Sequence, residues 1–434
     1  MNKKIKIYIF CFLILLLVLP AIQKETKMFH IKGLNGSYTL AQEKKLTLKS
    51  WFNSQYQKQC DKYLEDHIGF RNMFIRLFNQ LDFSLFNKSH AQKVEIGKNG
   101  YLYEKRYIRS YLGINFAGEN KLNNKVLKTK AVQDSLKNKD VHLLVLIAPG
   151  KADYYPEYLL SRYDKIEKTQ SNYEFVKQKF DAHGINYIDF NSYFLEMKDT
   201  TSLPLFPKCG VHWSYYSMKY VIDSLIKYIE TVKNIDMPDL YIDSVELTTH
   251  PKFTDYDIGD ALNIYSKIPQ DTLAYPVFRV ENDSTKVKPD VLIIGDSFYW
   301  TFSQTELPEK IFKMEDFWYY LKEVNRKEKF PVNILNFKNE ILSKDIIVLW
   351  TTVAQFHDYD FGFANKMFQK LNNNDEITES EIREKLIEYY TDQIKNNADW
   401  LEHIAEKARK NNIPLEEMIR NDAEYMVDKK NNKN

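Results

Sequence analysis

The sequence has few cysteines, almost no net charge and no pattern of metal ligands. Three of its 434 residues are cysteine, and because Cys11 lies in an N-terminal apolar run, only Cys60 and Cys209 could pair; this excludes a disulfide framework. The 61 Lys and Arg against 59 Asp and Glu leave a formal charge of +2, which gives no reason to expect a nucleic-acid partner. No Cys/His spacing indicates zinc and no glycine-rich phosphate loop is present, so no cofactor is implied.

Internal repeats and long low-complexity segments are also missing, and the one long apolar run stands at the N-terminus. Ile7–Ile22 holds 16 uncharged residues and follows Lys3, Lys4 and Lys6. The basic flank predicts a cytoplasmic N-terminus with the rest of the chain outside the cytoplasmic membrane. Because Leu19-Pro20-Ala21 is a poor cleavage site, an uncleaved membrane anchor is favoured over a cleaved signal peptide.

The chain divides into four parts by composition. Residues 1–22 form the anchor or signal, 23–90 a polar linker and a helical segment, 91–373 an α/β domain, and 374–434 a charged helical extension. The extension is expected to pack on the domain as surface helices rather than to form a dedicated partner-binding module. Aromatic residues make up 15% of the chain, which suits either a sugar-binding surface or a large aromatic core.

Strands alternate with helices through the third part, which predicts an α/β fold with a mainly parallel sheet flanked by helices. The near-continuous apolar runs are typical of strands covered on both faces. The strands are expected at Val141–Ala148, Ile185–Phe190, Val291–Ile294 and Asp345–Trp350, with helices at about 170–183 and 214–232. A hairpin with an Asn-Gly turn is expected at 94–103, and irregular strands with turns at 240–285.

The strand Val291–Ile294 stops at Gly295-Asp296-Ser297. Ligands of open α/β sheets bind at the carboxyl ends of strands, so Ser297 is a candidate nucleophile. Gly295 permits a tight turn, and the backbone N–H groups that follow open a helix and can form an oxyanion hole. The same three residues are common in ordinary turns, and Asp296 is expected to serve as a turn carboxylate.

The base that Ser297 needs has a candidate in His212, in the loop Phe206–Ser214 before a helix. A histidine there also suits a helix cap or a core position. Its neighbour Trp213 suits either the core or a sugar-stacking surface. Neither residue alone decides between these interpretations.

Four further side chains are expected near the same sheet edge. Lys151 follows the strand that ends at Ala148 and suits either an anionic sugar or solvent. Tyr299 and Trp300 open the helix after the serine, where one is expected to stack on a sugar and one to pack inward. Gln355, after the last strand, can donate a hydrogen bond.

In this order, His212-Trp213 followed by Gly295-Asp296-Ser297 resembles the extracytoplasmic SGNH-hydrolase-like domain of the alginate O-acetyltransferase family, the AlgX/AlgJ type. The resemblance runs from residue 1 to about 370 and includes Asp66–Arg71, Gly97–Tyr103, Ala148–Lys151 and Tyr155–Glu157. It implies an SGNH fold and acyl transfer by Ser297 and His212 onto an exported or surface polysaccharide. It also implies that a separate membrane acyltransferase supplies the acetyl group.

One position departs from the family pattern, which has Asp two residues before the histidine where this chain has Gly210. The acid partner orients the imidazole and stabilises the imidazolium. Three explanations of this glycine are open. Another carboxylate takes the place of the missing aspartate, a Ser–His dyad is sufficient for catalysis, or the domain binds polysaccharide without catalysis. The candidate carboxylates are Asp153, Asp189, Asp255, Asp257 and Asp260. A carbohydrate esterase, with water as acceptor, is the other enzyme that the pattern allows.

Overall fold

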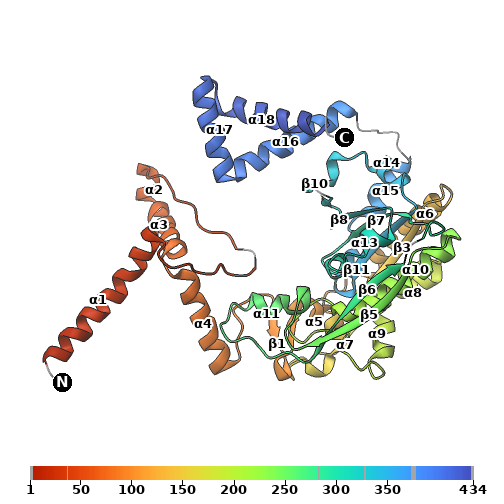
Figure 1. Ribbon diagram of the computed structural model, residues 1–434, viewed down its shortest axis with the longest axis horizontal. Coiled ribbons are helices and arrows are strands. Elements are labelled where there is room, and N and C mark those ends of the chain that lie inside the picture. Colours follow the sequence, from red (N-terminus) through yellow and green to blue (C-terminus); the bar gives the residue numbers. More distant parts are fainter. Residues whose placement is uncertain (1–2, 37, 282, 327–328, 373–377, 432–434) are drawn as a thin grey trace.

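The computed structural model describes residues 3–36, 38–281, 283–326, 329–372 and 378–431. Its largest sheet has seven strands in the order β10-β9-β8-β7-β11-β3-β4 (Figure 1). In chain order these strands are β3 (His142–Ala148), β4 (Tyr187–Asp189), β7 (Asp290–Gly295), β8 (Met314–Tyr319), β9 (Glu323–Asn325), β10 (Lys329–Pro331) and β11 (Ile346–Thr352). The strands from β8 to β4 run parallel, while β9 and β10 add an antiparallel edge. The expected α/β class is confirmed, with a mixed edge that the sequence did not indicate.

Apolar side chains fill both faces of this sheet because successive residues of a strand point to opposite sides. Leu144 and Ile293 pack on one face and Val145 and Ile294 on the other, and all four are buried. The first face is covered by α5 (Lys105–Tyr111), α9 (Phe190–Met197), α10 (Met218–Lys233) and α12 (Tyr299–Ser303). The second is covered by α6 (Glu119–Lys137), α8 (Asn172–His183), α14 (Phe337–Leu342) and α15 (Phe363–Asn372).

The strand β8 escaped sequence analysis because it carries a charged residue in the sheet. Asp316 is 1% exposed and forms ion pairs with Arg326 and Lys344. An ion-paired carboxylate can be buried at acceptable cost, but it interrupts the apolar run by which a covered strand is recognised.

Two antiparallel pairs lie outside the main sheet. The expected hairpin consists of β1 (Val94–Ile96) and β2 (Leu102–Glu104), with Asn99 and Gly100 both at positive φ. The region expected to be irregular holds a long ribbon of β5 (Asp239–Thr248) and β6 (Leu273–Glu281). Between these two strands lie a 3₁₀ turn, η4 (Phe253–Tyr256), and α11 (Asp257–Ala261). Two short helices, α7 (Lys151–Tyr154) and α13 (Pro308–Ile311), complete the domain.

The N-terminal part is helical as expected. The helix α1 (Lys3–Thr26) is the one helix of the described residues with the length and composition of a membrane span or signal sequence. It is followed by α2 (Leu48–Phe52), α3 (Gln55–His67) and α4 (Arg71–Phe86). The end of α1 contacts the corner between α3 and α4, where a Cβ on Gly69 would lie 2.1 Å from the carbonyl oxygen of Pro20.

The C-terminal extension forms three helices with a core of their own (Figure 1). They are α16 (Glu379–Asn396), α17 (Ala398–Asn411) and α18 (Leu415–Asn431). Residues 374–377, where the extension was expected to begin, lie outside the described residues. The hydroxyl of Tyr389 donates to the carbonyl of Lys329 at 2.8 Å, so the bundle touches the domain at the antiparallel edge of the sheet.

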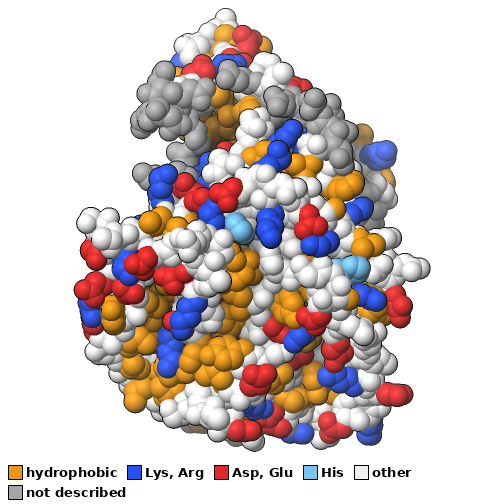
Figure 2. Space-filling view, turned by 90° about the vertical axis from the view of Figure 1, so that its right-hand side faces the viewer, with side chains coloured by type: hydrophobic (Ala, Val, Ile, Leu, Met, Phe, Trp, Pro, Cys, Tyr) orange, Lys and Arg blue, Asp and Glu red, His pale blue; other side chains and the backbone are white. Residues whose placement is uncertain are grey.

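Charged side chains of both signs are interspersed on the domain face shown in Figure 2, in keeping with the small net charge. Cys11, Cys60 and Cys209, all within the described ranges, are free thiols.

Candidate active site

The turn after β7 places Ser297 at the carboxyl edge of the sheet. A Cβ on Gly295 would lie 2.7 Å from the carbonyl oxygen of Trp350, so glycine is required for the close approach of β7 and β11 there. The Asp296 carboxylate accepts hydrogen bonds from the amides of Phe298 and Thr352, both at 3.0 Å. It is 1% exposed, and burial raises its pKa. Asp296 therefore holds the turn against β11.

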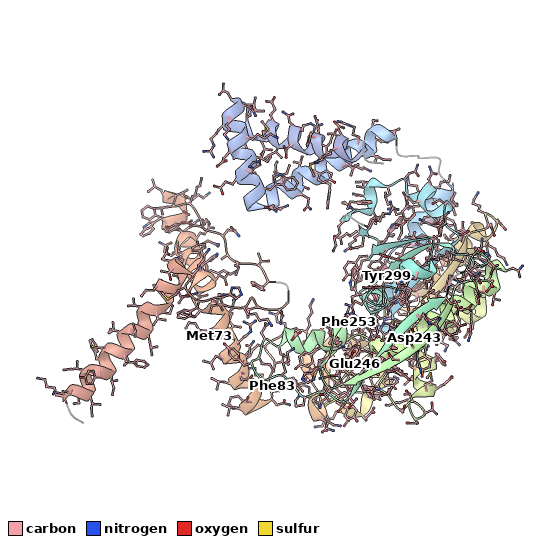
Figure 3. All side chains as sticks on the ribbon, viewed as in Figure 1. Met73, Phe83, Asp243, Glu246, Phe253 and Tyr299 are labelled. Carbon is pink, nitrogen blue, oxygen red and sulfur yellow. The ribbon has the colours of Figure 1, made fainter. Side chains whose placement is uncertain are left out.

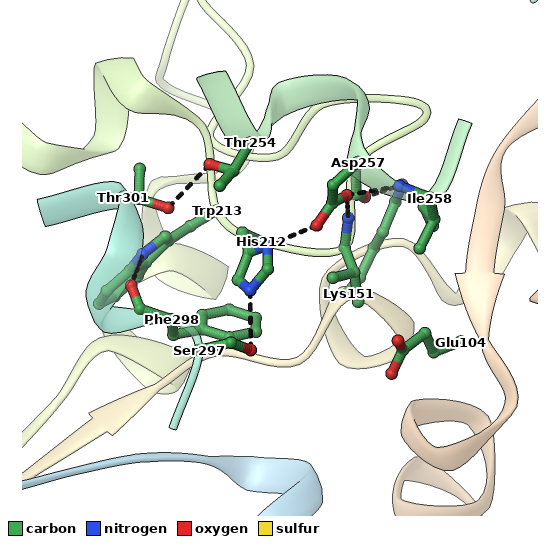
Figure 4. Close-up of polar contacts among 12 residues, drawn as sticks. Glu104, Lys151, His212, Trp213, Thr254, Asp257, Ile258, Ser297, Phe298 and Thr301 are labelled. Atoms are coloured by element: carbon green, nitrogen blue, oxygen red, sulfur yellow. Dashed lines mark hydrogen bonds and ion pairs between the residues drawn. The ribbon is translucent and has the colours of Figure 1, made fainter. Parts of the chain in front are cut away.

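The imidazole of His212 bridges Ser297 and an aspartate (Figure 4). Its Nε2 lies 2.9 Å from Ser297 Oγ, and its Nδ1 lies 2.6 Å from Asp257 Oδ2. With hydrogen on Nδ1, the ring donates to the carboxylate and accepts from the serine hydroxyl. The imidazole is largely buried, with 9% of its side chain exposed. These contacts are those of a nucleophile, a base and the acid that orients the base.

Asp257 comes from α11, on the segment between β5 and β6. Its Oδ1 accepts hydrogen bonds from the amides of Val211 at 2.8 Å and Ile258 at 2.7 Å. One carboxylate thus binds the imidazole, the residue before it and the start of its own helix. A carboxylate held by several donors is fixed in orientation, as an acid partner must be.

None of the other four candidate carboxylates, all within the described residues, forms a hydrogen bond with the imidazole. Asp189 caps α9 by accepting from two backbone amides. Asp260 pairs with Lys267 at 3.0 Å. Asp255 is buried and Asp153 half-buried, and burial raises the pKa of each carboxyl to about 7.

Gly210 lies where a side chain would strike the turn that carries Asp257. A Cβ at this position would be 2.6 Å from Pro207 Cγ, 2.9 Å from the carbonyl oxygen of Thr254 and 3.0 Å from the carbonyl carbon of Asp255. Non-bonded carbon and oxygen atoms do not approach so closely without displacement. The backbone of η4 therefore occupies the space that an aspartate at position 210 would need.

Lys151 lies in neither of the environments expected for it, solvent or an anionic sugar. Its side chain is fully buried, and its Nζ donates to the carbonyls of Lys208 and Gly210, both at 2.7 Å. Burial lowers its pKa to about 7. The amine therefore fastens the loop that leads into His212.

The aromatic side chains singled out in the sequence mostly pack inward. Trp213 is fully buried and donates from Nε1 to the carbonyl of Phe298 at 3.1 Å, so it is a core residue rather than a sugar platform. Tyr299 is 1% exposed and stacks on Phe317, with ring centroids 4.2 Å apart. Trp300 is half-buried against the same ring. Gln355 is half-buried in the 3₁₀ turn η6 (Val353–Asp358), after β11.

The sequence patterns gave no sign of a half-buried cation beside the serine turn. Arg106 lies in α5, donates from Nε to Glu104 at 2.6 Å and stands 5.0 Å from the ring centre of Tyr107. Its positive charge lowers the pKa of Asp296, against the larger effect of burial. The signal available was weak, because an arginine soon after a hairpin has no distinctive spacing.

The family model that matches the chain is that of the SGNH hydrolase-like domain of acetyltransferase AlgX, over residues 94–301. This range includes Ser297, His212 and Asp257, and it confirms the resemblance seen in the sequence. No protein of curated function matches the sequence.

The solved structures that match the chain include proteins of Pseudomonas and Bacillus. The O-acetyltransferase domain of Pseudomonas putida AlgJ matches with a TM-score of 0.43 and 13% identity, covering 64% of this chain and 99% of that one. Pseudomonas aeruginosa AlgX matches with a TM-score of 0.39 and 14% identity, and the match covers 63% of this chain and 67% of that one. Bacillus cereus PatB1 with a sulfonyl adduct matches with a TM-score of 0.40 and 10% identity, covering 62% and 98%.

Proposed function

We propose that this protein is a polysaccharide O-acetyltransferase. The match of residues 94–301 to the SGNH hydrolase-like domain of acetyltransferase AlgX supports this proposal. The observation that carries the proposal is the unbroken chain of contacts from Ser297 through His212 to Asp257. These contacts support the proposal despite Gly210, because Asp257 supplies a carboxylate from another segment.

Acyl transfer proceeds in two balanced steps. In the first, Ser297 Oγ attacks the carbonyl carbon of an acetyl donor while His212 Nε2 takes the hydroxyl proton; the bond to the donor then breaks and His212 returns the proton to the leaving group. In the second, His212 takes the proton of a sugar hydroxyl as that oxygen attacks the acetyl-serine. The Ser297 oxygen then leaves and recovers the proton.

The negative oxygen of each tetrahedral intermediate needs a hydrogen-bond donor. The amide of Phe298 donates to Asp296 Oδ1, and the amides of Tyr299 and Trp300 donate to carbonyls of the turn. We therefore propose that the backbone amide of Ser297 itself donates a hydrogen bond to this oxyanion. The sequence had suggested the amides after the turn for this role.

The N-terminal helix indicates where in the cell the reaction takes place. With α1 as an anchor and Lys3, Lys4 and Lys6 before its apolar run, the catalytic domain stands outside the cytoplasmic membrane. There it meets an exported or surface polysaccharide as acceptor, and a separate membrane acyltransferase supplies the acetyl group.

Hydrolysis of p-nitrophenyl acetate tests the catalytic serine. The wild type is expected to release nitrophenol, and Ser297→Ala to lose this activity by at least about 10³-fold. Ser303→Ala, at the end of α12, the helix that follows Ser297, is the matched control and should keep the wild-type rate. Equal background rates in the wild type and in Ser297→Ala would contradict the proposal.

Mass spectrometry separates transfer from hydrolysis. The wild type incubated with the ester and surface oligosaccharides should give sugars heavier by one acetyl group, and Ser297→Ala none. Release of acetate with no acetylated sugar for any glycan tested would identify the protein as a carbohydrate esterase instead.

A further inference from the structure

Helix α4 exposes apolar side chains and buries polar ones, which is the reverse of an ordinary surface helix. Large apolar side chains on its outer side are exposed: Met73, Phe74, Leu77, Phe78, Leu81, Leu85 and Phe86. Its inward side holds polar residues that are less than a tenth exposed. Arg76 donates to the carbonyl of Lys32 at 2.8 Å, and Asn79 donates to the carbonyl of Leu262 at 2.9 Å.

Six of these seven exposed residues, all but Phe86, form one stripe, which we call the α4 stripe: Met73, Phe74, Leu77, Phe78, Leu81 and Leu85. At about 100° per residue, they fall within an arc of roughly 140° on the helix. Phe83 lies outside the arc, packs against the domain core and points toward the domain in Figure 3. A continuous apolar surface of this kind marks an interaction site.

The α4 stripe begins beside the end of α1. Gly69, two residues before α4, packs against the backbone of Pro20 and Lys24 so closely that a side chain would not fit. The amide group of Gln23 exchanges two hydrogen bonds with the backbone of Phe29, at 2.7 and 3.0 Å, which fixes the chain where it leaves α1. If α1 enters a membrane, α4 starts close to the membrane surface (Figure 1).

The charge of this part of the chain suits phospholipid headgroups. Residues 23–76 contain eight Lys against five Asp or Glu, whereas the whole chain is nearly neutral; the two Arg of this stretch instead bind Asp66 and main-chain carbonyls. Anionic lipids attract such basic segments, and an amphipathic helix inserts its apolar side at the boundary between headgroups and acyl chains.

We propose that the α4 stripe binds the lipid surface of the membrane that α1 enters, so that the protein contacts the bilayer through a second element besides its span. A second helix at the interface restricts the angle at which the catalytic domain stands on the membrane. This proposal does not depend on the acyl-transfer reaction proposed above.

Depth-sensitive labelling of the full-length protein tests the contact. In a background with Cys11→Ser and Cys60→Ser, with the buried Cys209 retained, Leu81→Cys carries a nitrobenzoxadiazole fluorophore. The matched control is Leu127→Cys, an exposed leucine of α6 on the domain. Both proteins are placed in nanodiscs of phosphatidylcholine and phosphatidylglycerol, with and without doxyl-labelled lipid.

Doxyl lipid is expected to quench the label at position 81 several-fold more strongly than the label at position 127. Equal quenching at both positions would overturn the proposal. Protection of position 81 from aqueous iodide without quenching by doxyl lipid would also overturn it, since a protein partner would then cover the stripe. Retained hydrolysis of p-nitrophenyl acetate by each labelled protein shows that its fold is intact.

Discussion

At the scale of single residues, the site depends on a carboxylate that the local motif does not contain. Asp257 lies 45 residues after His212 and binds it at 2.6 Å, while its other oxygen holds Val211. Ser297 and His212 were identified from short patterns, because a strand that ends in a turn and a histidine loop are local features. Asp257 remained one of five carboxylates, because a loop sequence does not show which carboxylate folds back onto the imidazole.

Asp257→Asn should lower kcat for ester hydrolysis by about 10³- to 10⁴-fold, because an amide stabilises the imidazolium poorly and favours the wrong tautomer. Asp260→Asn, on the same short helix but paired with Lys267, is the control and should retain activity. Steady-state kinetics at neutral pH measure both. Comparable activity in the two variants would show that the acid is dispensable.

A buried acid next to the site, Asp255, is expected to make the stability of the protein depend on pH. Asp255 is fully buried, and within the described part of the chain neither of its carboxylate oxygens accepts a hydrogen bond of ordinary geometry. Burial raises its pKa to about 7 from an ordinary 3.8, so between these values the folded protein binds more protons than the unfolded chain. The contribution of Asp255 is present below about pH 4 and is lost as the pH rises through 7.

Asp255→Asn should therefore be less sensitive than the wild type to a rise in pH from 4 to 8. The wild type is expected to lose roughly 4 kcal/mol more unfolding free energy across this window, as an upper value. Urea unfolding at several pH values measures the difference. Parallel curves for the two proteins would show that Asp255 does not titrate in this range.

At the scale of elements, the active site depends on the docking of two loops at the sheet edge. Lys151 fastens the histidine loop from one side by donating to the carbonyls of Lys208 and Gly210. On the other side, the backbone of η4 packs against Gly210. Thr254 of η4 also contacts Thr301 of α12, with 3.1 Å between the hydroxyl oxygens.

Gly210→Ala should displace η4 and draw Asp257 away from the imidazole. We expect a loss of about 1–3 kcal/mol in unfolding free energy from overpacking, together with a fall in kcat. Gly210→Asp should behave worse, and Gly210→Asp with Asp257→Asn should not recover activity, because η4 fills the space. Denaturant unfolding and ester hydrolysis of the three variants provide the measurement, and recovery in the double variant would show that the acid can act from either position.

At the scale of the whole molecule, sequence patterns were informative wherever packing follows local periodicity. The covered strands β3, β7 and β11, the helices α8 and α10 and the N-terminal apolar helix were placed close to their observed bounds, whereas other flanking helices such as α6 were not predicted. The strand β8 was missed because Asp316 is neutralised by partners that lie far from it in sequence. The burial of Lys151 could not be predicted either, since only the folded loop supplies its two carbonyl partners.

The C-terminal helices should be separable from the α/β domain. Their apolar core, which includes Ile394, Ile404 and Ile419, is distinct from the cores on the two faces of the sheet. A protein that ends at Asn372 is therefore expected to hydrolyse p-nitrophenyl acetate at the wild-type rate, with its Tm lowered by a few degrees through lost contacts such as that of Tyr389 with Lys329. Aggregation or inactivity of the shortened protein would show that the bundle is part of the domain's fold.

The packing of η4 on Gly210 also affects how related genomes are interpreted. A survey that looks for the catalytic acid at a fixed place in an alignment would classify this chain as a pseudoenzyme, because the inspected column holds glycine. Here the proposed acid partner, Asp257, comes from a different segment, and Gly210 makes room for the backbone that precedes it. In proteins with similar sequences, the acid partner is therefore better found by asking which side chain contacts the imidazole than by asking which residue lies two positions before the histidine.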